Sequence, residues 1–182
     1  MILNHKNLLI VAGTGRNVGK TEFICRLIKK FRSIADIYAL KVSAVYPDEE
    51  MYHGSHADSE LVGRLFEEFR TDLDKDTSRV LRAGAKRAFY LRSENDRIRE
   101  GYLAFRNAIP EDAVVVCESN SLREVVEPGL MILIRSEAHV LKPRAAVLLP
   151  MCDFEITSDG QSGFYGLEDI ELTTETGWGY RR

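Results

Sequence analysis

The chain has 182 residues, of which 45% are hydrophobic and 29% charged, and its formal net charge is −3 at pH 7. A slightly acidic chain of this kind lacks the positive field with which proteins bind nucleic acid or anionic membrane surfaces, so we expect neither partner. Its apolar runs are too short to span a bilayer, its first residues lack a secretory signal pattern and its cysteines are scattered, so we expect a cytoplasmic protein with reduced thiols.

The first predicted element is a strand over residues 7–12, a continuous apolar run typical of a central parallel strand with both faces covered. Residues 13–21 follow with the sequence GTGRNVGKT and lead into a predicted helix. Glycines allow backbone N–H groups to turn toward an anion, and a helix N-terminus adds unpaired donors and the positive end of its dipole. This order of strand, glycine-rich turn and helix predicts a phosphate-binding loop.

Each loop residue has an expected place in such a site. Lys20 is expected to reach the β- and γ-phosphates of a nucleotide, and the Thr21 hydroxyl is expected to ligate Mg²⁺. Arg16 folds across the phosphates of its own chain or reaches toward a neighbouring subunit, or it is an exposed loop arginine. The common pattern has glycine at the position of Thr14, so an ordinary glycine-rich turn is the alternative interpretation. The residues predicted to surround the nucleotide phosphates are Gly13, Thr14, Gly15, Arg16, Asn17, Val18, Gly19, Lys20 and Thr21.

The helix after the loop is predicted over residues 23–31, where Phe23, Leu27 and Phe31 recur every four residues. A second strand is predicted over residues 36–42, and a strand, helix and strand in sequence imply a right-handed crossover and a parallel pair. Lys41 lies at the end of that strand. It contacts the γ-phosphate or an acidic substrate, or it simply reaches solvent.

The following segment is less regular. Residues 43–58 form a polar loop whose carboxylates and imidazoles suit either a metal site or a solvated surface loop. Residues 59–69 show apolar side chains at helical spacing, so we expect a helix there, as a lid over the nucleotide or as part of the core.

Later elements alternate between helix and strand. We expect a short helix from Asp76 to about residue 81, a strand over 86–91, a helix over 94–109 and a strand over 112–118. Strands over 130–134 and 145–149 complete a set of about six. This alternation predicts an α/β fold, a doubly wound and mainly parallel sheet flanked by helices. One domain covers residues 1–182, and 151–182 are a C-terminal extension whose docking the pattern leaves open.

Four residues follow predicted strands and would therefore meet at one edge of the sheet, where open α/β sheets bind ligands. They are Gly13, Lys41, Glu118 and Asp153. Glu118 is expected to hold Mg²⁺ directly or through water, and its alternative role is a carboxylate facing solvent. Asp153 is a candidate acceptor for guanine N1 and N2. With Lys20 and Lys41, Glu118 completes the predicted catalytic set, and Thr21 and Glu118 are the predicted metal ligands.

Several segments resemble known families. GTGRNVGKT (13–21) resembles the loop of dethiobiotin synthetase. In order, LKVSAVYP (40–47), KDTSRVLRAGAKRAFYL (75–91) and VVVCES (114–119) are similar to the adaptor family of molybdopterin-guanine dinucleotide biosynthesis. The resemblance implies a P-loop nucleoside triphosphate hydrolase fold. It also implies that Lys75, Asp76 and Arg79 lie near a substrate or partner surface.

The sequence therefore predicts Mg²⁺-dependent binding of a purine nucleoside triphosphate, GTP or ATP, with slow hydrolysis. Catalysis would come from positioning and charge neutralisation, since phosphoryl transfer needs little covalent help from the protein. The resemblance implies an adaptor with a protein partner in molybdopterin-guanine dinucleotide synthesis. The alternative is an ATP-dependent ligase or kinase acting on a small acid or amine, as in dethiobiotin synthetase. A homodimer fits each of these functions.

Overall fold

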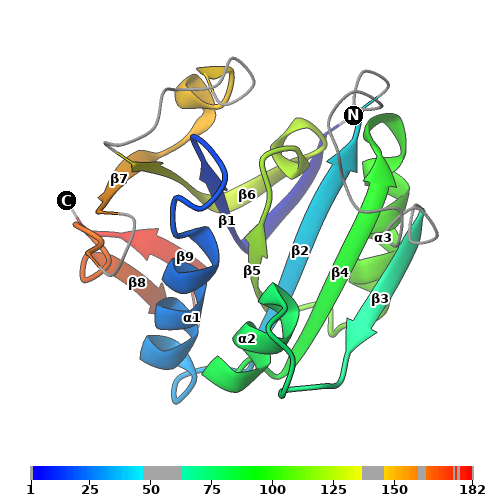
Figure 1. Ribbon diagram of the computed structural model, residues 1–182, viewed down its shortest axis with the longest axis horizontal. Helices are drawn as coiled ribbons and strands as arrows, with labels where there is room; N and C mark the ends of the chain where they lie inside the picture. The colour runs from blue at the N-terminus through cyan, green and yellow to red at the C-terminus, as the bar shows by residue number, and fades with distance from the viewer. Residues whose placement is uncertain are drawn as a thin grey trace.

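The computed structural model describes residues 2–46, 63–136, 146–159, 163–173, 175 and 177–181. The main sheet consists of β1 (Leu3–Gly13), β2 (Ile37–Val45), β3 (Arg64–Glu68), β4 (Arg87–Glu94), β5 (Val114–Glu118), β6 (Val126–Ser136) and β7 (Phe154–Ser158). Its seven strands lie in the order β3-β4-β2-β5-β1-β6-β7 (Figure 1). All neighbours in this order are parallel except β3, which pairs antiparallel to β4 at one edge.

Helices cover both faces of the sheet (Figure 1). The helices are α1 (Lys20–Phe31), α2 (Asp76–Ala83) and α3 (Ile98–Asn107), with short 3₁₀ turns η3 (Asn95–Arg97), η4 (Leu122–Glu124) and η5 (Leu149–Met151). A separate hairpin of β8 (Ile170–Thr173) and β9 (Gly177–Tyr180) packs with α1 and α2 on one face, and α3 packs on the other. The fold is α/β with a mostly parallel sheet, an arrangement compatible with double winding.

The predicted strand over residues 7–12 is confirmed as the centre of β1. Residues 8–12 have no exposed surface, because β5 and β6 flank them and helices cover both faces. The predicted strands over 36–42, 86–91, 112–118 and 130–134 are likewise confirmed within β2, β4, β5 and β6. The helices at 23–31 and 76–81 are confirmed as well, and the one at 94–109 is divided into η3 and α3.

The predicted helix over 59–69 is wrong where the structure describes it, because residues 64–68 form β3. Pairing with β4 gives this segment its backbone partners and sets the Glu67 carboxylate against the Arg87 guanidinium, with two N–O contacts of 2.6 Å. Two adjacent apolar residues, Leu65 and Phe66, fit a strand as well as a helix in so short a segment. Of the predicted loop over 43–58, residues 43–45 continue β2, and 47–58 lie outside the described residues.

The predicted strand over 145–149 is also wrong where the structure describes it, over residues 146–149. Residues 149–151 form the 3₁₀ turn η5, where Pro150 lacks the N–H that a strand ladder needs. The next strand of the sheet is β7, five residues further on, which the sequence analysis did not predict because the segment FEITS is half polar. Leu148 is nevertheless buried, since it packs in the apolar cluster under α3.

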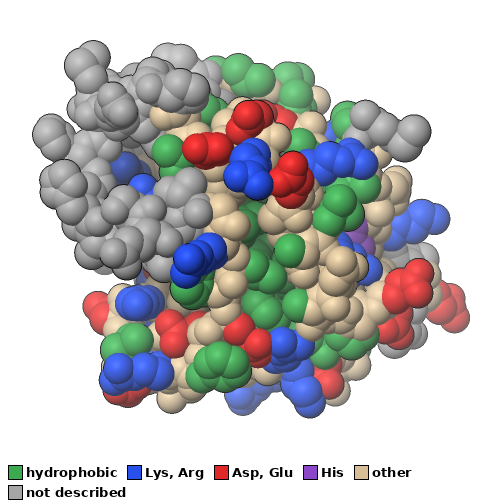
Figure 2. All heavy atoms as spheres, turned by 90° about the vertical axis from the view of Figure 1, so that its right-hand side faces the viewer, with side chains coloured by type: hydrophobic (Ala, Val, Ile, Leu, Met, Phe, Trp, Pro, Cys, Tyr) green, Lys and Arg blue, Asp and Glu red, His purple; other side chains and the backbone are tan. Residues whose placement is uncertain are grey.

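The described part of the C-terminal extension docks on its own domain. β7 extends the main sheet, and the indole N–H of Trp178 in β9 donates to the carbonyl of Val115 at 3.0 Å. The Trp178 ring also meets Phe31 edge-on, at the last residue of α1. Figure 2 shows acidic and basic side chains interspersed over the side of the molecule that faces the viewer there. No helix in the described part of the chain is both long and apolar enough to cross a membrane.

Candidate functional site

The loop between β1 and α1 turns sharply at the carboxyl edge of the sheet. Asn17 and Gly19 both have positive φ, of 58° and 93°, which bring the chain round to start α1 at Lys20. Gly13 lies under this turn, where a Cβ would be 2.7 Å from Val18 Cγ2 and 2.9 Å from Lys20 Cδ. The chain therefore needs glycine at position 13 for the loop to close over the strand end.

The Asn120 side chain holds the start of the loop through two hydrogen bonds to Gly13. Its Oδ1 accepts from the Gly13 N–H at 2.9 Å, and its Nδ2 donates to the Gly13 carbonyl at 2.8 Å. A side-chain amide can satisfy both backbone groups of one residue in this way. Sequence analysis missed this role, and the only signal was an asparagine two residues beyond the end of β5, which gave no hint of its partner.

Lys20 holds its ammonium over the loop, where Nζ donates to the carbonyl of Gly15 at 2.9 Å. Burial lowers the pKa of Lys20, and the nearby positive charges of Lys41 and Arg16 lower it further, although Glu118 acts in the opposite direction. A bound anion would oppose this shift, because negative charge close to an ammonium raises its pKa.

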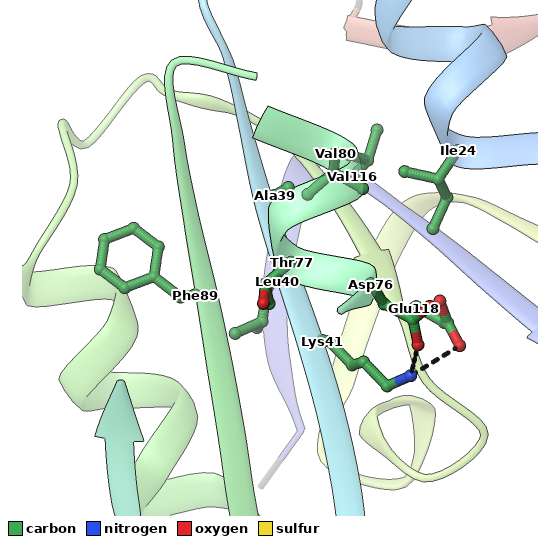
Figure 3. Close-up of a pocket in the computed structure, with 10 residues that line it drawn as sticks. All are labelled: Ile24, Ala39, Leu40, Lys41, Asp76, Thr77, Val80, Phe89, Val116 and Glu118. Carbon is green, nitrogen blue, oxygen red and sulfur yellow. Dashed lines mark hydrogen bonds and ion pairs between the residues drawn. The ribbon is translucent and has the colours of Figure 1, made fainter. Parts of the chain in front are cut away.

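A small charged network lies beside the loop. The Thr21 hydroxyl donates to Glu118 Oε2 at 2.5 Å, and Lys41 Nζ lies 3.4 Å from the other carboxylate oxygen. Lys41 also donates to Asp76 Oδ2 at the start of α2, and Figure 3 shows its side chain directed at both carboxylates. One ammonium thus pairs with two carboxylates that come from different elements.

The pKa shifts of Lys41 and Asp76 both favour the charged form of the group. Burial on its own lowers the pKa of Lys41, but the charges of Glu118 and Asp76 outweigh it and the net shift is upward. Burial raises the pKa of Asp76, yet the hydrogen bond and charge of Lys41 turn the net shift downward. Both groups are therefore charged at neutral pH.

These groups line a cavity of about 530 Å³ at the carboxyl edge of the sheet. The loop and the first turn of α1 provide Arg16, Asn17, Gly19, Lys20, Thr21 and Glu22. Neighbouring elements provide Lys41, Asp76, Arg79 and Glu118. On its wall the Arg79 guanidinium pairs with Glu22 at 3.0 Å, which links α2 to α1.

A second cavity of about 450 Å³ adjoins the first and shares Arg16, Lys20, Lys41 and Glu118 with it. It also touches the loop at Thr14 and Gly15 and passes over the ends of β2 and β5. Its far wall is apolar, formed by Val147, Leu148 and Met151. The Thr14 hydroxyl is buried and has no hydrogen-bond partner among the described residues.

Most of the residues predicted for the site thus meet around these two cavities. Gly13 and Val18 are exceptions that support the loop from beneath, with Val18 fully buried. Of the residues that the resemblance placed near a substrate, Asp76 and Arg79 line the first cavity, whereas Lys75 is the residue that precedes α2.

Asp153 does not join the site. Its carboxylate accepts from the N–H of Met131 at 2.7 Å, and its own N–H donates to the Met131 carbonyl at 2.9 Å. Met131 pairs with Ile10 in the middle of β1, three residues before Gly13. The prediction depended on a strand over 145–149 that does not form, and Asp153 instead precedes β7 at its amino end.

No family model matches the chain, and neither curated proteins nor solved structures gave a match. The site combines a glycine-rich turn at a helix N-terminus with a half-buried lysine, Lys20. Beside them, two carboxylates share the Lys41 ammonium, and one of the two accepts a hydrogen bond from the Thr21 hydroxyl.

Proposed function

We propose that the chain is a P-loop nucleotide-binding domain that binds the Mg²⁺ complex of ATP or GTP and hydrolyses it slowly. The observation that supports this most directly is the contact between the Thr21 hydroxyl and the Glu118 carboxylate, on the wall of a cavity that Lys20 also lines. Thr21 comes from the first turn of α1 and Glu118 from the end of β5, so two elements distant in sequence supply one pair of oxygen ligands.

The polyphosphate would lie against the start of α1. The first N–H groups of a helix have no intrahelical acceptor, and the helix dipole adds positive potential there. Lys20 supplies a cation whose pKa is lowered by burial, and a bound anion would stabilise its charged form. The cavity volume of about 530 Å³ is within the usual range of small-ligand sites.

The residues present also fit Mg²⁺. Hard oxygen ligands suit this ion, which usually takes only one or two carboxylates and completes its shell with phosphate oxygens and water. Thr21 and Glu118 would hold it, and Asp76 lies across Lys41 from them. Mg²⁺ would neutralise charge on the phosphates. Within the described residues no three His, Cys, Asp or Glu side chains form a cluster, which fits an ion held mainly by its nucleotide.

Slow turnover follows from the same geometry. Lys20 and Lys41 would stabilise negative charge that develops on the transferred phosphoryl group. Glu118 already accepts a hydrogen bond from Thr21 and pairs with Lys41, so it is poorly placed to accept a proton from water as well. Strong charge neutralisation, with Glu118 engaged in this way, suits an adaptor that reads its nucleotide state, such as one in molybdopterin-guanine dinucleotide synthesis. A homodimer in the cytoplasm would be compatible with that role.

The second cavity supports an alternative. It gives a small acid or amine room beside Lys41 and the phosphates, as a dethiobiotin-synthetase-like ligase or kinase requires. Stimulation of phosphate release by small acids or amines, with a phosphorylated product detected by mass spectrometry, would favour this activity. Partner capture that depends on the bound nucleotide would favour the adaptor.

The first test measures melting temperature with ATP or GTP, with and without Mg²⁺. A ligand at 100 times its Kd stabilises a protein by about 2.7 kcal/mol, which is a readily visible shift. We expect a shift with one of the two nucleotides that Lys20→Ala abolishes, while Lys29→Ala, on the exposed side of the same helix, retains it. If neither nucleotide shifts the wild-type protein, the proposal fails.

A second test separates the metal ligands from the phosphate ligands. Thr21→Val removes the hydroxyl with little change of shape, and Glu118→Gln removes the charge with little change of volume. Both variants should lose the Mg²⁺-dependent part of nucleotide affinity and of phosphate release. An unchanged Mg²⁺ dependence in both would contradict the assignment of these residues to the metal.

A further inference from the structure

The ring of Phe164 lies directly over the end of the phosphate loop. A Cβ built on Gly19 would be 3.0 Å from both Cε1 and Cζ of this ring and 3.3 Å from the Ser158 hydroxyl. These distances are tighter than most real Cβ contacts, so a side chain at this position would push against the ring and the hydroxyl. Gly19 is also the residue with φ of 93° that turns the loop into α1.

The same ring packs along the first two turns of α1. It meets Phe23 edge-on, with ring centroids 5.2 Å apart, and the Arg26 guanidinium lies 5.4 Å from its centroid. Arg26 in turn pairs with Glu22, a residue of the cavity wall, at 3.1 Å. Phe164 therefore contacts the loop end and the helix start together.

The main sheet fixes the position of this ring. Phe164 forms an antiparallel bridge with Ser158, the last residue of β7, and the Tyr165 N–H donates to the Thr157 carbonyl at 3.3 Å. The Gly163 N–H, next to Phe164, donates to the Asp159 carboxylate at 2.9 Å. Because β7 pairs with β6, the ring is attached to the sheet from which the loop itself emerges.

We infer that Phe164 is a positioning residue for the phosphate loop, which holds Gly19 in its left-handed conformation and so directs the first amides of α1 into the cavity. Phe164 is then part of the nucleotide site as a support of the loop, although it is not among the residues that line either cavity. The effect of Phe164 on nucleotide affinity rests on the proposed function, whereas its effect on how well ordered the loop is does not.

The experiment compares two aromatic contacts of α1. Phe164→Ala removes the contact at its start, and Trp178→Phe weakens the contact at its end, where Trp178 meets Phe31. Hydrogen exchange of residues 13–22 is measured in nucleotide-free protein under conditions in which both variants are folded. We expect exchange in this segment to rise about tenfold in Phe164→Ala and to stay at the wild-type rate in Trp178→Phe. Phe164→Leu, which keeps apolar bulk over Gly19, should restore most of the protection.

Nucleotide affinity provides the second readout. If the loop is in its binding conformation only about a tenth of the time, the apparent Kd rises about tenfold. Phe164→Ala should show this loss and Trp178→Phe should not, even if both lower the melting temperature. Equal exchange in the loop of both variants would overturn the inference. If the wild-type protein binds no triphosphate, the proposed function fails, and the exchange experiment still decides the role of Phe164.

Discussion

The polar groups at the two ends of the parallel sheet differ in whether they contact one another directly or line cavities. At the amino end, buried polar groups contact one another directly: His5 Nδ1 and the Tyr102 hydroxyl are 2.5 Å apart, and the Trp178 indole meets the Val115 carbonyl. His5 Nε2 has no hydrogen-bond partner among the described residues. At the carboxyl end, Lys20, Lys41, Glu118 and Asp76 surround open cavities instead. The amino end is thus arranged for stability, and the carboxyl end keeps charge available for a ligand.

The largest effect on stability is expected at the amino end. Trp178→Ala removes a large buried ring and leaves the Val115 carbonyl without its donor. We expect unfolding in denaturant to show a loss of about 3–5 kcal/mol. Tyr165→Ala, at a side chain that is 77% exposed, is the control and should stay within about 0.5 kcal/mol of the wild type. A similar loss of stability in both variants would show that the Trp178 contacts do not contribute specially to the stability of the fold.

We expect His5 to make the free energy of unfolding depend on pH. Burial lowers the pKa of His5 from 6.5 to about 4, helped by the nearby charge of Arg106. The unfolded chain therefore binds the proton more strongly, and stability falls as pH drops from 6.5 toward 4, by up to about 3 kcal/mol.

The measurement for this prediction is the free energy of unfolding between pH 7 and pH 5, where most carboxylates stay ionised. His5→Gln lacks the titrating group, so its stability should change less than that of the wild type over this range. Parallel curves for the two proteins would show that His5 does not carry the pH dependence.

At the carboxyl end, a substitution should affect binding far more than stability. Lys20→Met removes an ammonium that burial disfavours and keeps a side chain of similar length. We expect nucleotide affinity to fall about a hundredfold, equivalent to about 2.7 kcal/mol. The free energy of unfolding without ligand should be unchanged or higher by about 1 kcal/mol. A large loss of stability would mean that Lys20 supports the fold itself.

The smallest effect is expected for Asp76→Asn. The carboxylate pairs with Lys41, but its side chain is 34% exposed, so solvent screening limits its contribution to about 1 kcal/mol or less. Because its pKa is lowered in the fold, this contribution is present above the unfolded pKa and is lost as pH falls through the folded value. Unfolding curves at pH 7 and pH 3 should therefore converge for wild type and variant at the lower pH.

Local sequence patterns determined the elements nearest the site. The apolar run before Gly13, the glycines of the loop and the helical spacing after Lys20 together place β1, the turn and α1, because each depends on neighbours a few residues away. The end of β5 at Glu118 followed from the same kind of run. β3 and β7 did not follow, since a short or half-polar strand is defined by its partner in the sheet.

Only the tertiary structure decided which distant side chains meet. Asn120 reaches Gly13 and Asp76 reaches Lys41 because strand order brings β5 and α2 to the loop, and nothing in the spacing of these residues encodes that order. Phe164 reaches Gly19 for the same reason, through β7. The sequence by itself predicted the glycine-rich turn between β1 and α1, because that turn depends on local backbone geometry. The contacts that support this turn, from Asn120 and Phe164, depend on packing between elements, because they exist only once the sheet has formed.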